Sequence, residues 1–150
     1  MTTPSSSLAL ALLMLATGIG IPIMAALNAG LGGRIGSPWL ATFILFLVCA
    51  LASGAVLTLI GLPLRLTLNA PPQYFLGGLL VVFYVLSVTY AAPRIGIGNA
   101  IFFVLLGQIA SAAAIDQFGL FGAPQTPITP QRWLGIGCMA VGVFLARRMA

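Results

Sequence analysis

The chain has 150 residues, of which 61% are hydrophobic and 5% are charged, with a formal net charge of +5. A soluble domain carries roughly 25% charged residues, so this surface is too apolar for water and its solvent must be lipid. The sequence has no Lys, Glu or His, and Asp116 is its single acid. Catalytic and metal-binding constellations are therefore excluded, and we expect no enzyme activity, no cofactor and no metal. The six scattered arginines form no basic stripe, which excludes nucleic acid as a partner.

Five apolar runs follow one another, each close to the roughly 20 residues that cross a hydrocarbon core as a helix. They are apolar on all faces, which excludes the alternating strands of a β-barrel. The first run has no basic residue before it, so we expect a retained helix and not a signal peptide. The sequence predicts one all-α transmembrane domain over residues 1–150, with helices at Leu8–Asn28, Pro38–Ile60, Tyr74–Ala92, Gly98–Asp116 and Gln131–Arg147.

Proline and glycine mark the expected helix ends. Pro38 follows a Gly- and Ser-rich stretch and suits the first turn of a helix, and Pro93 is expected to close the third run. The residues 119–130 contain three prolines, which predicts a loop without regular structure. Pro22 is the one proline inside a run, and we expect it to kink or break the first helix near residues 17–20.

The arginines give a weak orientation signal. Because five crossings put the chain ends on opposite sides, four arginines would lie on the C-terminal side and two on the N-terminal side. By the positive-inside rule this favours a cytoplasmic C-terminus, yet so small a bias would let some copies insert in the opposite sense. The two groups are Arg34, Arg94, Arg147 and Arg148 on one side, and Arg65 and Arg132 on the other.

Polar residues inside the runs are the candidate site residues, since each costs free energy in hydrocarbon unless it meets a partner or water. At 100° per residue, Gln108 and Ser111 share one helix face while Asn99 lies opposite. The alternative for each residue is a hydrogen bond that only joins helices. The candidates for a substrate pathway are Asn28, Tyr84, Ser87, Asn99, Gln108 and Ser111.

Asp116 lies at the end of the fourth run, directly before the expected loop. It could bind a cation or carry a proton, or it could pair with Arg132 at the start of the next helix, and we favour the structural pair. Small residues recur at four-residue spacing in several runs, which would let helix backbones approach closely in a bundle or dimer. These pairs are Ala16 with Gly20, Ala50 with Gly54, Gly107 with Ser111, and Ala110 with Ala114.

Several segments resemble the YdcZ-like family of the drug/metabolite transporter superfamily. They are NAGLGGRIGSPWLA from Asn28, the pair Gly77 and Gly78, PRIG from Pro93, GQ at Gly107, IDQFGLFG from Ile115 and RWLGIG from Arg132. The resemblance covers nearly the whole chain. It implies a five-helix unit equivalent to half of a ten-helix transporter, present as dual-topology copies or paired paralogues. The chain departs from the family pattern at Gln117, where a His is expected.

We therefore expect a bacterial inner membrane transporter subunit that moves a small metabolite or drug-like molecule by alternating access. An antiparallel homodimer, or a pair with a paralogue, would supply the inverted repeat that this mechanism uses. The scarcity of acids favours neutral, amphipathic or anionic cargo. The alternative is a non-transporting membrane subunit that assembles with another membrane protein. Beside its cargo and its partner subunit, the chain would contact only membrane lipid.

Overall fold

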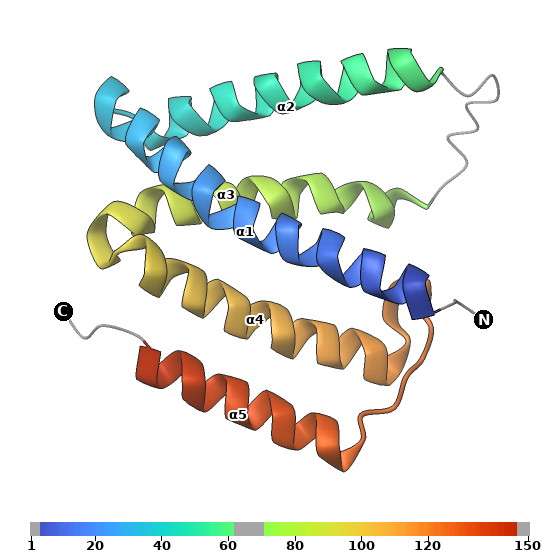
Figure 1. Cartoon of the computed structure of the whole chain (residues 1–150). Helices are drawn as coiled ribbons and strands as arrows, with labels where there is room; N and C mark the ends of the chain where they lie inside the picture. The colour runs from blue at the N-terminus through green and yellow to red at the C-terminus, as the bar shows by residue number, and fades with distance from the viewer. Residues whose placement is uncertain (1–3, 62–70, 147–150) are drawn as a thin grey trace. The chain divides into compact units, whose positions relative to one another are not determined.

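The computed structural model describes residues 4–61 and 71–146 as a set of helices, with no strand among them (Figure 1). The contacts group the chain into two compact units, unit 1 over residues 1–94 and unit 2 over residues 95–150. The all-α prediction is confirmed within the described ranges. The helices are α1 (Pro4–Ile35), α2 (Pro38–Ile60), α3 (Gly77–Ile95), α4 (Ile97–Phe118) and α5 (Pro130–Ala146), with short 3₁₀ turns η1 (Pro72–Leu76) and η2 (Leu120–Gly122).

Four of these helical segments are long and apolar enough to cross a membrane. They span 29, 23, 24 and 22 residues, with mean hydropathy between 1.7 and 2.7. Helix α5 has 17 residues, which is about 25 Å at 1.5 Å per residue and short of a core about 30 Å thick. The structure thus supports an α-helical membrane protein with four candidate spans. They are Ser7–Ile35, Pro38–Ile60, Pro72–Ile95 and Ile97–Phe118.

Helix α2 begins and ends at the predicted residues, Pro38 and Ile60. The hydroxyl of Ser37 accepts the Leu40 N–H at 3.2 Å, which satisfies one of the free donors in the first turn. Pro38 follows as the first helical residue, where a missing N–H costs nothing. At the other end Gly61 has a φ of 95°, a conformation that favours glycine.

The predicted end of the first helix is wrong, because α1 continues seven residues beyond Asn28 to Ile35. Of the kink or break expected near residues 17–20, the break does not occur, since Pro22 lies inside a helix that continues on both sides of it. A proline removes only one backbone hydrogen bond, and membrane helices tolerate that loss. The glycines at 30, 32 and 33, which read as a connection, are helical.

The boundary between α3 and α4 also differs from the prediction. Tyr74 belongs to η1, Pro93 lies inside α3, and Gly96 alone separates the two helices at a φ of 85°. Pro93 does not end the helix. A proline disfavours helical geometry at the residue before it, but Pro93 lies in the last turn of α3, where few backbone hydrogen bonds can be lost. Gly98 is helical. The predicted positions Arg65, Arg147 and Arg148 lie outside the described residues.

Unit 1 is packed through small residues. Ala25, Asn28 and Gly32 form one buried face of α1, with the three- and four-residue spacing of a helix face. A Cβ atom at Gly32 would lie 3.3 Å from the Pro38 Cα and 3.6 Å from the Thr89 Cγ2. The missing side chain therefore allows α1 to approach both α2 and α3 closely. The other buried residues of unit 1 are Ala41 and Thr42 of α2, and Val85, Val88, Thr89 and Ala92 of α3.

Unit 2 is a pair of helices, α4 and α5, that lie side by side (Figure 1). Gly119 ends α4 in the left-handed conformation, with a φ of 61°, as helices often end. The loop that follows is not wholly irregular, because Leu120–Gly122 forms the 3₁₀ turn η2. Within the described part of this unit only Ala100 and Ala113 are buried.

The outer surface of the helices is apolar. Leu51 is 75% exposed, Leu59 87% and Leu145 74%, and these are three of many large apolar side chains in this state. No residue in the most hydropathic window of α2 is buried within the chain. Contiguous apolar surface of this extent marks a membrane or protein contact. The chain therefore offers most of its side chains to lipid or to another subunit.

Candidate functional site

A buried polar cluster joins the three helices of unit 1. The Asn28 side-chain amide donates to Thr89 Oγ1 at 2.6 Å and lies 3.4 Å from Thr42 Oγ1. Each of the three residues is at most 3% exposed, so the contacts are shielded from solvent. In an apolar environment such hydrogen bonds hold helices together, and an unpaired amide would cost several kcal/mol in hydrocarbon. The Asn28 amide nitrogen is thus already engaged within the chain.

Sequence reasoning named Asn28 but missed Thr42 and Thr89. The two threonines lie 14 and 61 residues away along the chain, a separation that no local pattern reveals. The signal that could have found them is that both are polar residues inside otherwise apolar runs. Threonine is easily passed over there, because its hydroxyl can bond to its own helix backbone.

The two polar candidates of α3 face different surroundings. The Tyr84 hydroxyl oxygen is buried and makes no hydrogen bond to any residue that the structure describes. Ser87 is exposed and lies in an apolar groove of about 410 Å³ that is also lined by Trp39, Phe83 and Tyr90. A buried hydroxyl without a partner is unusual and calls for an explanation.

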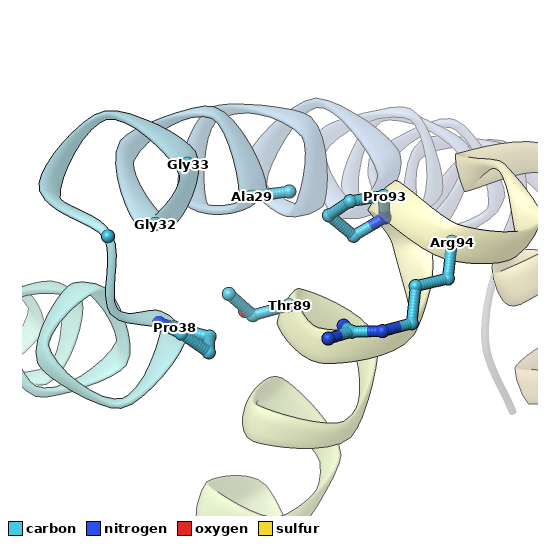
Figure 2. Close-up of a pocket in the computed structure, with 8 residues that line it drawn as sticks. Ala29, Gly32, Gly33, Pro38, Thr89, Pro93 and Arg94 are labelled. Carbon is cyan, nitrogen blue, oxygen red and sulfur yellow. The ribbon is translucent and has the colours of Figure 1, made fainter.

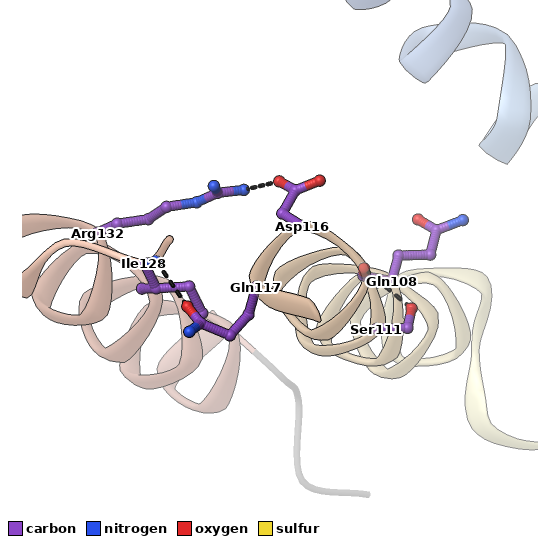
Figure 3. A network of polar contacts seen from close by, with 6 residues as sticks. All are labelled: Gln108, Ser111, Asp116, Gln117, Ile128 and Arg132. Atoms are coloured by element: carbon purple, nitrogen blue, oxygen red, sulfur yellow. Dashed lines mark hydrogen bonds and ion pairs between the residues drawn. The ribbon is translucent and has the colours of Figure 1, made fainter. Parts of the chain in front are cut away.

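The candidate side chains on α4 differ in whether they have a hydrogen-bond partner. The Ser111 hydroxyl donates to the Gly107 carbonyl at 2.9 Å, and the Asn99 amide donates to the Ile95 carbonyl at 2.9 Å. Gln108 is exposed, and its amide has no hydrogen-bond partner within residues 4–61 and 71–146. Figure 3 shows Gln108 and Ser111 on the same side of α4, with the Gln108 amide pointing away from the helix.

The end of α4 is tied to the start of α5 by charge and by hydrogen bonds. Asp116 forms an ion pair with Arg132 (Figure 3). Both side chains are about one-third exposed, at 34% and 38%, so water screens the pair in part. Thr129 caps α5, because its hydroxyl accepts the Arg132 N–H at 3.3 Å. The sequence raised both an ion-binding and a structural role for Asp116, and the geometry brings the carboxylate to the arginine.

Gln117 organises the loop between the two helices of unit 2. Its side-chain oxygen accepts the Ile128 N–H at 2.7 Å, and its backbone carbonyl accepts the Gln125 side chain at 3.0 Å. The neighbouring Asp116 carbonyl accepts the Thr126 N–H at 2.8 Å. The side chain at the position that departs from the family pattern therefore acts here as a hydrogen-bond acceptor for the loop.

Within residues 4–61 and 71–146, no group of three His, Cys, Asp or Glu residues gathers at any point. Cys49 and Cys138 are both exposed and unpaired by disulfides. Each unit thus has a polar group without a hydrogen-bond partner among the described residues, the buried Tyr84 hydroxyl in unit 1 and the exposed Gln108 amide in unit 2.

Comparison with known proteins gives one match. A family model with the description "Putative inner membrane exporter, YdcZ" matches residues 9–145 of the chain. Neither the curated proteins nor the solved structures contain a match. The matched range includes all the described helices from residue 9 onward except for the last residue of α5.

Proposed function

The chain belongs to the YdcZ family of the drug/metabolite transporter superfamily, and on that premise we propose that it is one subunit of a small-molecule exporter. It is an integral protein of the inner membrane, in a family named for export and not for catalysis. The proposed cargo is a small metabolite or drug-like molecule that lacks strong positive charge, because the chain has one acid and that acid is paired with an arginine.

The exposed side-chain amide of Gln108 is the main support for this proposal. Gln108 lies at the middle of the 22-residue helix α4, on an exposed surface, with an amide that no described residue satisfies. An unpaired amide in hydrocarbon is costly, so the position requires water, cargo or a second chain beside it. We propose that the Gln108 amide donates a hydrogen bond to cargo in a polar pathway near the membrane centre.

The other candidate residues take different roles in this proposal. The Tyr84 hydroxyl, which is buried without a partner, is a second hydrogen-bonding group for cargo, and Ser87 contributes from its aromatic groove. Asn99 and Ser111 line the pathway while bonding to their own helix. Asn28 supports the pathway indirectly, because its amide holds three helices in place.

We propose five crossings, with α5 as the fifth. Its length of about 25 Å falls short of an average core by only a few ångströms, a mismatch that local thinning of the bilayer absorbs at modest cost. An odd number of crossings puts the two chain ends on opposite sides of the membrane. Two copies in opposite orientations then form an inverted repeat, which suits alternating access about a central site.

The small-residue pairs support a second copy as the partner. A Cβ atom added at Gly20, Gly54 or Gly107 would meet no atom within 4 Å. No described residue therefore packs closely against these three glycines. Such small residues let helix backbones approach each other across an interface. The four-residue pairs built on them lie on α1, α2 and α4, which gives a homodimer several surfaces for helix contact.

Transport by purified protein in liposomes tests the proposal. Wild-type vesicles should accumulate or release at least one member of a metabolite panel, whereas Gln108→Ala should lower the rate by a few-fold to tenfold, as expected for one lost hydrogen bond. The control is Thr17→Val on α1, a position outside the proposed pathway. The Thr17 hydroxyl bonds to the Leu13 carbonyl of its own helix, so the rate of this variant should stay within about twofold of wild type.

Two outcomes would overturn parts of this account. Equal rates in Gln108→Ala and wild type, with equal stability, would remove Gln108 from the pathway. No transport of any panel member, together with a stable complex with a different membrane protein, would favour the non-transporting subunit instead. Circular dichroism of each variant would show whether the helices remain folded.

A further inference from the structure

The helix ends of unit 1 border a small open cavity that the transport proposal does not use. A space of about 240 Å³ is bounded by the last turns of α1 and α3 and the first residue of α2, and its lining includes Gly33, Pro38, Thr89 and Arg94. Small-molecule sites usually measure about 300–1,000 Å³. This space is therefore suited to one polar group of a ligand and not to a whole drug-like molecule.

The cavity carries a positive charge that no carboxylate side chain can neutralise. Figure 2 shows the Arg94 side chain extending from the end of α3 back toward Thr89. Arg94 donates one hydrogen bond to the Tyr90 carbonyl, which leaves other N–H groups of its guanidinium available. Asp116 is the single acid of the chain and is paired with Arg132. Arg34 adds a second positive charge in the last turn of α1, although it is not one of the residues that line the cavity.

One side-chain contact connects the cavity with the aromatic groove. The Arg94 guanidinium lies over the Tyr90 ring, 3.6 Å from its centroid. Tyr90 in turn lines the groove of about 410 Å³ with Trp39 and Phe83, which are 66% and 71% exposed. A cavity with a cationic side chain and an apolar groove are thus connected by a direct arginine–tyrosine contact.

We propose that an anionic phospholipid occupies these two spaces. Its phosphate would bind the Arg94 guanidinium, which matches phosphate geometry through paired N–H donors. One acyl chain would lie along Trp39, Phe83 and Tyr90. The position at the ends of candidate spans puts the charge at headgroup depth, where anionic lipids attract arginine. The site goes beyond the proposed export function and does not depend on it.

Quenching of Trp39 fluorescence by lipid tests the proposal. The full-length protein with Trp133→Phe, so that Trp39 is the one tryptophan left, is reconstituted with phosphatidylglycerol or phosphatidylcholine brominated on the acyl chains. We expect apparent affinity for brominated phosphatidylglycerol to exceed that for phosphatidylcholine by roughly tenfold, as for a charge-assisted hydrogen bond. Equal affinities would overturn the proposal.

Two variants separate lipid binding from any structural role of Arg94. Arg94→Gln should bring the two affinities within about twofold of each other. Gly33→Leu keeps the arginine but fills the cavity, because a Cβ there meets no atom within 4 Å, and it should reduce the preference as well. A preference that persists in both folded variants would contradict the site.

Inorganic phosphate distinguishes the two sources of the anion. If millimolar inorganic phosphate reversed the quenching by phosphatidylglycerol, a free phosphate would be the true occupant and the lipid assignment would be wrong. Quenching that is insensitive to phosphate, yet sensitive to both variants, would support the phospholipid.

Discussion

The two units of the chain differ in how far their polar side chains are buried among the helices. In unit 1 the Asn28 cluster lies inside the packed helices, fully buried and internally satisfied. In unit 2 the ion pair and the loop hydrogen bonds lie at the helix ends, while Gln108 at the middle of α4 is open. In unit 1 the Asn28 amide holds helices together, whereas in unit 2 the Gln108 amide has no hydrogen-bond partner within that unit's described residues.

This difference indicates that the two units differ in how strongly packing fixes their helices. Close approach at Gly32 and hydrogen bonds across three helices stabilise one arrangement of unit 1. The two helices of unit 2 have only two buried residues in the part that the structure describes, so less packing opposes a change in their arrangement. We expect unit 1 to be the more rigid of the two units, and we expect unit 2 to contribute Gln108 as a hydrogen-bonding group for cargo.

The largest expected effect comes from filling the close contact at Gly32. Gly32→Leu would put a side chain where a Cβ already lies 3.3 Å from the Pro38 Cα, and overpacking of this kind costs about 1–3 kcal/mol. The control is Gly30→Leu on the same helix, where a Cβ meets no atom within 4 Å. Unfolding by sodium dodecyl sulfate, followed by circular dichroism, measures the difference. Equal loss in both variants would contradict the close approach of the helices.

A smaller effect is expected at the polar cluster. Asn28→Leu removes the donor to Thr89 and Thr42, and hydrogen bonds between membrane helices contribute roughly 0.6 to 1.7 kcal/mol. A double-mutant cycle with Thr89→Val should give a coupling free energy of the same size. Thr17→Val is the control, because its hydroxyl bonds only to the Leu13 carbonyl of its own helix. A coupling free energy near zero would show that the cluster does not stabilise unit 1.

The smallest effect is expected at the Asp116–Arg132 pair of unit 2. Both side chains are partly exposed, and exposed pairs contribute roughly 0 to 1 kcal/mol. We expect Asp116→Asn and Arg132→Gln to lower the free energy of unfolding by no more than this, with a coupling term that shrinks at high salt. If the coupling free energy between Asp116 and Arg132 exceeded that between Asn28 and Thr89, the polar contacts of unit 2 would be the more stabilising ones, which would contradict the comparison.

The sequence predicted the features that local chemistry controls. Ser37 and Pro38 indicated the start of α2. The pairing of Asp116 with Arg132 was favoured because one residue ends the fourth run and the other lies at the start of the next helix. The end of α1 was not predictable in the same way. Glycines at 30, 32 and 33 have the composition of a turn, and their helical role depends on the approach of Pro38 and Thr89 from elsewhere in the chain.

The candidate site shows the same limit. Periodicity identified Asn28, Tyr84 and Gln108 as polar groups in apolar runs, since their cost in hydrocarbon is a property of each residue alone. It could not say which of them had partners. Asn28 meets Thr89 across 61 residues of sequence, and such pairing depends on tertiary packing. Gln117 was marked as a departure from the family pattern, but its bond to Ile128 required the folded loop.

The most direct test of the account is the side of the membrane on which the C-terminus lies. Reporters that are active on only one side of the inner membrane would be fused to the C-terminus of the full chain and expressed at native level. Five crossings and an antiparallel homodimer predict signal from both sides in comparable amounts. Signal from one side alone, with the chain expressed as its only family member, would contradict the antiparallel pairing on which the transport mechanism depends.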